Sequence, residues 1–591
     1  MKGAELIVER LIQERVPYLF GLCGHGILGF LDAVYDRQAD IKTVSVHHES
    51  VAAFMADAYY RVSHTPVATF TSCGPGSANL IVALASAFQD SSALLAITGN
   101  VPTSQWNRGP FQETGRYFQG DFVNAVRPYV KRSFQPTRTD MLDLALHQSF
   151  NLMRSGRPGP VNIDVPLNVF VEPVEGDHPD PWPKTNYTRP GGEPAAITKA
   201  ARMLAAAERP VIVAGHGVDL SQAEAELVAL AEALSIPVAT TPLGKGVIAG
   251  GHPLSLGPTG RNGSYMANAA TRNADVILAL GTRFDDRATS AWLPGYTYSI
   301  PPTRLIHVDI DAAEIGRNYP AEIGIIGDVK VVADQLRAAA QLVQVSESAR
   351  DRWLETIAGW RSRWQEKTSE HRQSDAVPIR PERLVSELRK ALPDEAIVLA
   401  DVGQHHNWLV AEYLASQSKG LLQSWGFASM GFAVAGVLGA KLAAPDRPAV
   451  SVSGDAGFLM LPSVVATAVE YGIPAVWIVW NNFGYNSIRE QQMGYFGAGR
   501  ELVTSFREES TGRLLSPDFA AMARSMGAWG ALVERPQDLG EQLRQAIDSG
   551  RPAVLDVRVD RDARMPSTAS WDLPPLPHPE PSFGWGEDGV D

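Results

Sequence analysis

Two polar positions in the stretch GDAGFLMLPSVVATAVEYGIPAVWIVWNN, residues 454–482, are suited to holding a cation. Asp455 follows the apolar run AVSVSG, and Asn482 closes a second apolar run, AVWIVWNN. Carboxylate and amide oxygens can bind Mg²⁺, which takes few protein ligands and shares its remaining positions with phosphate and water. If the two positions meet, they predict a Mg²⁺ site that carries a phosphate-bearing molecule.

The elements between the two positions predict that they do meet. The run LPSVVATAVEYG has helical spacing, with Pro462 near its start and Gly472 at its end. A strand, a crossover helix and a second parallel strand form a right-handed unit, and both strands finish at the same edge of the sheet. Ligands of open α/β sheets bind at that edge. Asp455 and Asn482 are therefore expected to lie side by side.

A second candidate acid, Glu49, stands where the strand-like run TVSVHHE gives way to a helical pattern. An isolated acid at such a point is most often a first-turn carboxylate stabilised by the helix dipole. The run TSCGPGSANL, residues 71–80, is a Gly- and Pro-rich turn that leads into a helix. By themselves these two features indicate only that strands, turns and helices follow one another in this part of the chain.

The composition is that of a globular protein, with 45% hydrophobic and 20% charged residues. A formal net charge of −13 argues against nucleic-acid binding through bulk electrostatics. Cys23 and Cys73 are the only cysteines, so no disulfide framework is expected and a reducing compartment is indicated. The sequence shows no signal peptide and no uninterrupted apolar run of about 18 residues, so we expect a cytoplasmic protein without a membrane span.

The 591 residues divide into three α/β blocks and a tail. Strand and helix patterns alternate over residues 1–175, 190–345 and 377–564, and linkers separate the blocks. This alternation predicts an α/β protein of three doubly wound domains with parallel sheets. Residues 565–591 are rich in Pro and aromatics, so they are expected to be disordered or to form a lid over a neighbouring surface.

The motif at residues 454–482 resembles the diphosphate-binding signature of thiamine diphosphate (ThDP) enzymes, in which Gly-Asp is followed, one helix later, by a double Asn. The resemblance implies that Asp455 and Asn482 bind Mg²⁺ through their side chains and Gly484 through its carbonyl. It also implies that the backbone approaches the diphosphate at Gly454, Ala456 and Gly457. Many members have Gly in place of Ala456, but a small residue still permits this approach, and members that resemble acetolactate synthase often share the Ala.

The same resemblance gives roles to other segments of the first and third blocks. Glu49 matches the glutamate that hydrogen-bonds N1′ of the aminopyrimidine, a role that needs a buried carboxylate sharing a proton with a ring nitrogen. Met430 matches the bulky apolar residue below the thiazolium, and plain core packing is the alternative. The other implied contacts are Gly74, Pro75 and Asn79 at the aminopyrimidine and Gly403, Gln404 and His405 at the diphosphate.

The resemblance also implies an oligomer. Glu49 belongs to the first block and the metal ligands belong to the third, and the family places the cofactor between two subunits. A homodimer is therefore the expected minimum, and a homotetramer is the predicted assembly.

The middle block resembles the FAD-binding domain of acetolactate synthases. An acidic residue after a strand often binds ribose hydroxyls, and Arg pairs with phosphate. The loop GPTGRNG departs from those synthases at Arg261 and Asn262, and related enzymes that act on coenzyme A (CoA) thioesters hold ADP in this domain. FAD, ADP and an empty, vestigial site are the three expectations. The matching positions are Gly281, Arg283, Asp285, Arg287, Asp309 and Asp328.

Three further residues are candidates for substrate chemistry. His25 stands in a Gly-His-Gly segment where acetolactate synthases usually have Gly-Gly-Ala, and it could orient a carbonyl, donate a proton or be purely structural. Gln112 follows Phe111 in a segment that lines the substrate side in acetolactate synthases and in 2-hydroxyacyl-CoA lyases. Glu490, in the string REQ, resembles the proton-shuttling glutamate of 2-hydroxyacyl-CoA lyases, and a solvated helix acid is the alternative.

Three functions therefore stay open. The first is carboligation of a 2-keto acid, as in acetolactate synthases, and the second is cleavage of a 2-hydroxyacyl-CoA to formyl-CoA and an aldehyde or ketone. The third is a non-catalytic protein of the same fold that binds partners, against which Glu49, Asp455 and Asn482 speak. In both enzymatic cases the cofactor supplies the electron sink, and the protein supplies positioning and proton transfers.

Overall fold

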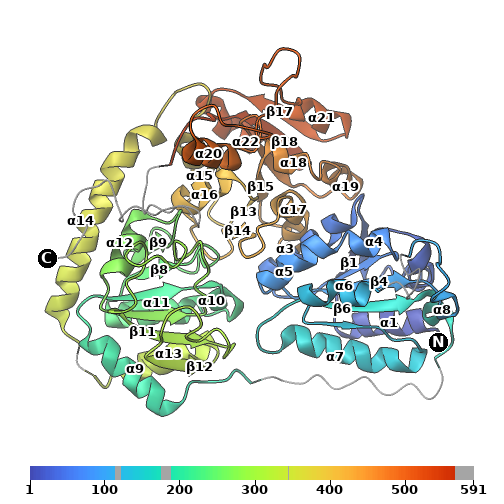
Figure 1. Ribbon diagram of the computed structural model, residues 1–591, viewed down its shortest axis with the longest axis horizontal. Helices are drawn as coiled ribbons and strands as arrows, with labels where there is room; N and C mark the ends of the chain where they lie inside the picture. The colour runs from blue at the N-terminus through green and yellow to red at the C-terminus, as the bar shows by residue number, and fades with distance from the viewer. Residues whose placement is uncertain (114–120, 175–187, 344, 566–591) are drawn as a thin grey trace.

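The computed structural model describes residues 1–113, 121–174, 188–343 and 345–565, so the predicted tail lies outside the described residues apart from Met565. Figure 1 shows three α/β units, a blue N-terminal, a green middle and an orange C-terminal one, arranged around a common centre. Each unit is built on a six-stranded sheet whose neighbouring strands pair in parallel. The predicted fold of three doubly wound, parallel-sheet domains is confirmed, while the limits of the three blocks stay predictions.

The N-terminal sheet has the strand order β2-β1-β3-β4-β6-β5. Its strands are β1 (Tyr18–Gly21), β2 (Lys42–Ser45), β3 (Ala68–Thr71), β4 (Leu95–Asn100), β5 (Arg132–Phe134) and β6 (Val161–Pro166). The helices of this unit are α1 (Gly3–Gln13), α2 (Leu28–Tyr35), α3 (Glu49–Ser63), α4 (Pro75–Ala78), α5 (Ile81–Gln89), α6 (Phe122–Val126), α7 (Leu142–Arg154) and α8 (Leu167–Val171).

The middle sheet has the order β12-β11-β10-β7-β8-β9. Its strands are β7 (Pro210–Ala214), β8 (Val238–Thr240), β9 (Ser255–Pro258), β10 (Val276–Leu280), β11 (Arg304–Asp309) and β12 (Ile323–Ile326). Its helices are α9 (Pro194–Ala206), α10 (His216–Leu220), α11 (Glu224–Leu234), α12 (Tyr265–Asn273) and α13 (Val329–Ala340). The long helix α14 (Glu347–Arg372), yellow in Figure 1, then runs along the outside of the molecule towards the C-terminal unit.

The C-terminal sheet has the order β14-β13-β15-β16-β18-β17. Its strands are β13 (Ile397–Ala400), β14 (Leu421–Gln423), β15 (Ala449–Gly454), β16 (Val476–Asn481), β17 (Trp529–Val533) and β18 (Ala553–Arg558). Its helices are α15 (Pro381–Ala391), α16 (Gln404–Glu412), α17 (Phe432–Ala443), α18 (Asp455–Phe458), α19 (Val464–Glu470), α20 (Asn486–Phe496), α21 (Phe519–Ser525) and α22 (Pro536–Asp548).

The runs that form the central strands are apolar because helices bury both faces of a parallel sheet. All six residues of β16 are buried, as are the first five of β15. The two strands pair in parallel, with Gly454 opposite Trp480, and α19 lies between them in the chain as the helical pattern predicted. Their carboxyl ends therefore lie at one edge of the sheet.

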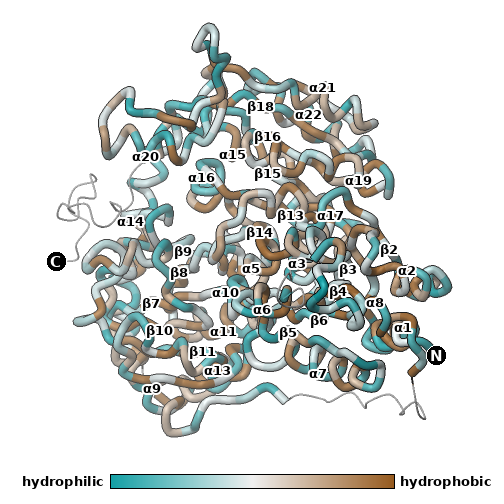
Figure 2. Tube along the Cα trace, turned by 45° about the vertical axis from the view of Figure 1, so that its right-hand side comes forward, coloured by the Kyte–Doolittle hydropathy of each residue, from teal (hydrophilic) through white to brown (hydrophobic). Residues whose placement is uncertain are grey.

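One hydrophobic core joins the N-terminal and C-terminal units. It contains residues 51–56 of α3 together with residues 432–435 of α17. The Phe54 and Phe432 rings meet edge to face with their centroids 6.2 Å apart. A side chain at Gly439 would collide with the Met55 carbonyl, so glycine lets the two helices approach closely. Figure 2 shows α17 as a largely apolar, brown segment beside α3.

A buried ion-pair cluster reinforces this junction. The Arg61 guanidinium, 2% exposed, donates to Asp57 at 2.6 Å and to Asp90 at 3.1 Å. It also donates to the backbone carbonyl of Gln423 at the end of β14. Asp90 in turn accepts a hydrogen bond from the Trp425 backbone N–H of the C-terminal unit at 3.0 Å. Arg61 and Asp90 thus have hydrogen-bond partners in both units, which fixes the position of one unit relative to the other.

Candidate active site

Asp455 and Asn482 lie together where the sequence predicted them, at the carboxyl edge of β15 and β16. Both side chains are buried, Asp455 completely and Asn482 to within 4%. The Asp455 carboxylate accepts hydrogen bonds from the backbone N–H of Ala456 at 2.8 Å and of Gly484 at 3.0 Å. Burial nevertheless raises the pKa of Asp455 to about 7. A carboxylate that is shielded from solvent in this way is a favourable ligand for a cation, because a nearby positive charge favours the ionised form.

A cavity of about 160 Å³ opens beside this edge. His405 lines it, and its buried Nε2 has no hydrogen-bond partner among the described residues. Burial lowers the pKa of His405 to about 3, so the ring is neutral and can donate or accept one hydrogen bond. The other predicted residues that line the cavity are Gly403, Gln404, Met430, Gly454, Ala456, Gly457, Asn482 and Gly484.

Asp401, which the sequence reasoning missed, holds the turn that precedes α17. Its buried carboxylate accepts hydrogen bonds from the backbone N–H of Gly431 at 2.9 Å and of Ala433 at 3.1 Å. Gly431 has a φ of +92°, which glycine adopts without strain. Asp401 also occupies the space beside Gly457, where a side chain would meet its Oδ2. Met430 is thereby fixed at the cavity wall.

Glu490, on α20, is linked to the predicted metal edge by a short chain of hydrogen bonds. Gln404 donates from Nε2 to Glu490 Oε1 at 2.5 Å and accepts from Asn482 Nδ2 at 2.9 Å. Burial raises the pKa of Glu490 to about 7, although the Gln404 hydrogen bond and three arginines oppose the rise. Such a carboxyl group can gain or lose a proton near neutral pH, as a general acid or base must.

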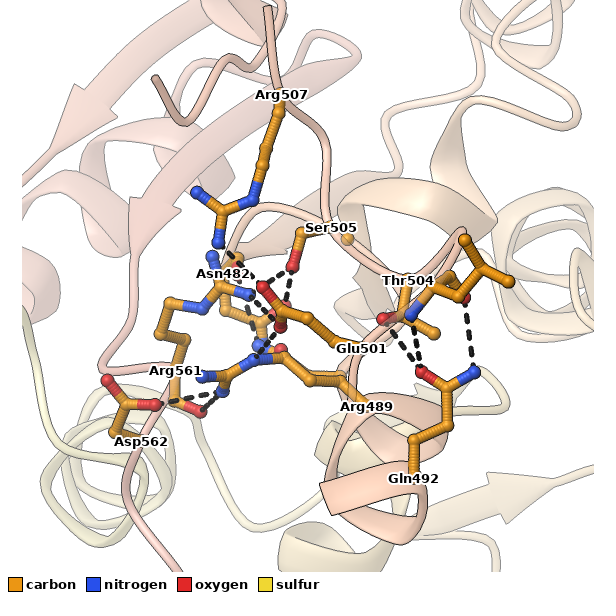
Figure 3. A network of polar contacts seen from close by, with 12 residues as sticks. Asn482, Arg489, Gln492, Glu501, Thr504, Ser505, Arg507, Arg561 and Asp562 are labelled. Atoms are coloured by element: carbon orange, nitrogen blue, oxygen red, sulfur yellow. Dashed lines mark hydrogen bonds and ion pairs between the residues drawn. The ribbon is translucent and has the colours of Figure 1, made fainter. Parts of the chain in front are cut away.

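A second polar network holds α20 in place, and Figure 3 shows its arginines gathered around Glu501. Arg489, the neighbour of Glu490, donates to Glu501 at 2.6 Å, and Arg507 donates to the same carboxylate at 2.7 Å. The Arg507 hydrogen bond is the main reason that the pKa of Glu501 falls to about 2. Arg489 also pairs with Asp562 at 2.8 Å, so the chain that follows β18 is tied to α20.

The N-terminal candidates gather at the carboxyl edge of their own sheet. Glu49 is the first residue of α3, is half-buried, and accepts a hydrogen bond from Asn79 Nδ2 at 2.9 Å. A side chain at Gly74, whose φ is +60°, would collide with the Gln112 carbonyl. His25 is exposed in the turn after β1. Pro75 begins the short helix α4 between Gly74 and Asn79.

The structure does not bring these N-terminal residues to the cavity within one chain. Among the described residues, every position that lines the cavity lies between 287 and 491, and Glu49, Asn79 and Gln112 are absent from its wall. The predicted site residues therefore lie in two groups, one at each sheet edge.

The middle-domain candidates fall into two groups. Arg287 lines the cavity and lies over the Trp425 ring, with its guanidinium carbon 5.9 Å from the ring centroid. Asp285 accepts a hydrogen bond from Trp425 Nε1 at 3.0 Å, which ties this loop to the C-terminal unit. Gly281, with a φ of +58°, packs directly on Gly217, so its lack of a side chain is explained by packing within the protein.

The remaining candidates make local contacts. Asp309, at the end of β11, accepts from the Asp311 backbone N–H at 2.9 Å, and burial raises its pKa to about 6. Asp328 caps α13 and pairs with Arg189 at 2.9 Å. Burial lowers the pKa of Arg157 of the N-terminal unit, the charge of Arg283 lowers it further, and nearby acids that include Asp309 oppose the fall, so another cation lies near this edge. Sequence reasoning missed Arg157 because its segment, GRPGPV, marks only the end of a loop.

The residues present fit a Mg²⁺ ion and a diphosphate. One carboxylate, one amide and one backbone carbonyl lie at the strand ends, next to a neutral imidazole whose Nε2 has no hydrogen-bond partner among the described residues. In the part of the chain that the structure describes, no three His, Cys, Asp or Glu side chains cluster as a metal site, which agrees with a set that contains a single carboxylate. The fit to a nucleotide in the middle domain is weaker, because the contacts of Asp285, Asp328 and Gly281 are made within the protein.

Comparison with known proteins agrees with this geometry. Residues 1–119, 197–336 and 401–557 match, in that order, the N-terminal TPP binding domain, the central domain and the C-terminal TPP binding domain of thiamine pyrophosphate enzymes. The chain belongs to the thiamine pyrophosphate enzymes. Thiamine pyrophosphate is another name for thiamine diphosphate, so the predicted family is confirmed.

The relatives of this thiamine pyrophosphate enzyme include acetolactate synthases. A probable acetolactate synthase large subunit of Methanocaldococcus jannaschii is 36% identical over 581 residues, covering 96% of this chain and 93% of the relative. The acetolactate synthase isozyme 3 large subunit of Escherichia coli is 32% identical, covering 95% of each. An acetolactate synthase of Mycobacterium bovis is also 32% identical, covering 96% of this chain and 89% of the relative. The prediction of an enzyme resembling acetolactate synthase is confirmed.

Over the described residues, none of the helices combines the length and the apolar character needed to span a bilayer. The predicted cytoplasmic location stays a prediction.

Proposed function

We propose that this chain is a Mg²⁺- and ThDP-dependent carboligase that acts on a 2-keto acid. The observation that carries the proposal is the arrangement of Asp455, Asn482 and Gly484 at one sheet edge, beside a cavity lined by His405, whose buried Nε2 has no hydrogen-bond partner among the described residues. Relatives named acetolactate synthase, which match nearly the whole chain, support this choice of reaction.

The side chains of Asp455 and Asn482 and the carbonyl of Gly484 would hold Mg²⁺. The amide nitrogen of Asn482 already donates to Gln404, so its oxygen is the atom that can face a cation. Gly403 and His405 would bind the diphosphate, and Met430 would support the ring that follows it. When bound, ThDP supplies an electron sink for the carbanion that forms next to the substrate carbonyl.

Two carboxyl groups of the chain would handle protons. Glu49 would hydrogen-bond a ring nitrogen of the cofactor, with Asn79 fixing the orientation of its carboxylate. Glu490, whose pKa is raised to about 7, would exchange a proton with the oxygen of the acceptor substrate. Gln404 would keep Glu490 in place relative to the metal edge, since it contacts both Glu490 and Asn482.

The two halves of the site support a homodimer in which each cavity is completed by a second copy of the chain. Glu49 stands at an edge of its own sheet, away from the described cavity wall. The N-terminal edge also exposes the apolar side chains of Phe111, 77% exposed, and Leu28, 56% exposed. An isologous pair would bring the N-terminal edge of each copy to the cavity of the other. The homotetramer stays a prediction.

A second candidate function is cleavage of a 2-hydroxyacyl-CoA to formyl-CoA and an aldehyde or ketone. Glu490, which is half-buried and has a pKa raised to about 7, favours it, because this reaction needs a base that removes the hydroxyl proton and later returns a proton. The adenine nucleotide of the middle domain also stays a prediction: a yellow purified protein would support FAD, and a colourless one that releases ADP would support the thioester reaction.

Reconstitution with the competing substrates tests the proposal. Protein treated with a chelator should consume pyruvate and form a carboligation product only after Mg²⁺ and ThDP are both restored. Asp455→Asn should remain inactive under the same conditions, because its amide lacks the charge that holds the cation. Release of formyl-CoA from a 2-hydroxyacyl-CoA, without turnover of 2-keto acids, would replace the first function by the second. Full activity in stripped protein would contradict both.

A further inference from the structure

A second cavity, of about 430 Å³, lies where the middle domain, α14, α15 and the end of α16 come together. Figure 1 shows the yellow α14 running along the outside of the middle unit towards the C-terminal unit, where α15 and α16 lie on the side that faces the middle unit. Its wall shares no residue with the cavity at the metal edge, and it contains none of the middle-domain positions predicted for a nucleotide. It is therefore a separate compartment, larger than the first.

The wall of the second cavity combines cations with apolar surface. Two carboxylates also belong to the wall, and each is already neutralised: Glu412 pairs with Arg372 at 2.7 Å, and Glu382 pairs with Arg380 at 2.9 Å. The cations of the wall thus outnumber its acids. They are Lys245, Arg361, Arg372, Arg389 and Lys390, and apolar surface comes from Ile248, Leu256, Met266, Trp364, Val385 and Leu414.

Arg361 is one of two cations of this wall without an ion pair among the described residues, and the other, Lys245, is bound to the end of α16. Its Nη2 donates to the carbonyls of Ser255 at 2.8 Å and Pro253 at 3.1 Å, and no ion pair of Arg361 occurs among the described residues. Burial alone lowers its pKa, with no nearby charge to compensate. By contrast, Arg389 pairs with the exposed Asp394, and Lys390 pairs with the half-buried Glu387. A half-buried guanidinium without a carboxylate is a binding group for an anion, which it can hold in bidentate fashion.

The second cavity also touches the far end of the helix that builds the first. Helix α16 begins at Gln404, in the wall of the metal-edge cavity, and ends at Glu412, in the wall of the second. The ammonium group of Lys245 donates to the carbonyls of Leu409 at 3.1 Å and Val410 at 2.5 Å, so it caps the carboxyl end of α16. One helix of about 13 Å, at 1.5 Å per residue, therefore connects the two compartments.

We propose that the second cavity is a binding site for a small organic carboxylate with an apolar body, and that α16 transmits its occupancy to the cofactor cavity. The carboxylate binds Arg361, and the apolar body packs on Trp364 and its neighbours. An inorganic anion would make no contact with this apolar surface, whereas a neutral hydrocarbon would leave the charge of Arg361 without a counter-charge. The site lies outside the proposed reaction, and its occupancy is detectable without turnover.

Isothermal calorimetry on the holoenzyme tests the binding site. The probes are octanoate and 3-phenylpropionate, which lack the keto group of a substrate. Both should bind the wild-type protein, and Arg361→Gln should weaken binding at least tenfold, because the guanidinium supplies the charge. Arg363→Gln, an exposed neighbour on α14, should bind like the wild type. Ser386→Leu, which fills part of the cavity, should also weaken binding, and it keeps the test valid if Arg361→Gln proves unstable.

The outcomes separate the explanations. The site would be overturned if neither probe bound the wild-type protein. It would also be overturned if both Arg361→Gln and Ser386→Leu bound the probes like the wild type, because the carboxylate would then bind elsewhere, for example in the catalytic cavity. The coupling has its own measurement: the Kd of ThDP for metal-loaded protein should shift at least threefold when octanoate is saturating, and the octanoate Kd should shift by the same factor with ThDP. Equal ThDP affinity with and without bound octanoate would overturn the role of α16.

Discussion

The N-terminal and C-terminal sheets share one strand order but carry different chemistry at the same edge. Counted from its own first strand, each runs 2-1-3-4-6-5, whereas the middle sheet runs 6-5-4-1-2-3. Glu49 and Gly74 follow the second and third strands of the N-terminal sheet. Gly403, Asp455 and Asn482 follow the first, third and fourth strands of the C-terminal sheet. One scaffold therefore supplies both halves of the proposed site, and the residues that follow the strands give each half its proposed chemistry.

The two edges also differ in how far their own chain encloses them. Asp455 is completely buried by its neighbours, and the cavity beside it has walls from the middle and C-terminal units. Glu49 is only half-buried, and the edge around it exposes apolar side chains such as Phe111. The C-terminal half is thus organised within one chain, while the N-terminal half offers a surface that a second copy can cover.

The largest effect should come from removing the proton-sharing acid of the N-terminal half. Glu49→Gln should slow exchange of the C2 proton of bound ThDP by about 10²–10⁴-fold, the usual contribution of a general acid–base group. Proton exchange followed by NMR measures this directly. Glu224→Gln is the matched control, since Glu224 is also half-buried and also begins a helix, α11. An exchange rate that Glu49→Gln leaves unaltered would show that the N-terminal edge does not meet the cofactor.

A smaller effect, of about 10²-fold, should follow from Glu490→Gln in the C-terminal half. The pKa of Glu490 is about 7, so its protonated form prevails below pH 7 and its ionised form above. Carboligation needs the protonated form as donor, and its kcat should therefore fall as the pH rises through 7. Cleavage needs the ionised form of Glu490 as a base, so the kcat of cleavage should rise as the pH increases through 7. Glu490→Gln should remove this limb from the pH profile, while Glu541→Gln, an exposed acid of α22, should keep it.

The smallest effect concerns the pairing of the two halves. Glu49→Gln and Asp455→Asn chains with different tags, expressed together and purified through both tags, should give heterodimers with about half of the wild-type activity. One of the two sites then contains both defects and the other contains neither, as follows from two-fold symmetry. Asp455→Asn paired with Asn482→Ala should show no recovery, because both changes affect the same half. Equal inactivity of both heterodimers would mean that each site is built within one chain.

Sequence patterns located the strand ends, since apolar runs and the crossover helix place Asp455 and Asn482 at one edge whatever surrounds them. The role of Asp401 depends on a contact with Gly431, thirty positions away in the chain, and nothing local marks it. The raised pKa of Glu490 likewise depends on burial by elements that sequence spacing does not place. The pattern of α20 indicated a helix but left open which of its faces is buried.

The relation between domains was the least predictable level. The second cavity exists only because α14, α15 and the middle sheet converge, and its wall draws on segments between residues 240 and 415. The Trp425–Asp285 hydrogen bond crosses the same kind of boundary. Such contacts depend on how the units pack against one another, and the periodicity within each unit does not specify that packing. A single sequence therefore predicts the units and their edges better than the space between them.

The junction of α3 with α17 has a consequence for dissection of the protein. Cutting the chain between the N-terminal and C-terminal units would expose the apolar faces around Phe54 and Phe432. It would also remove the Gln423 carbonyl from Arg61 and the Trp425 backbone N–H from Asp90. Neither fragment should therefore survive as a soluble module, and scanning calorimetry of the whole chain should show these two units melting in one endotherm. Chimaeras with related enzymes should keep their fold only when both units are exchanged together, because the buried contact surface between the units is formed by side chains of both.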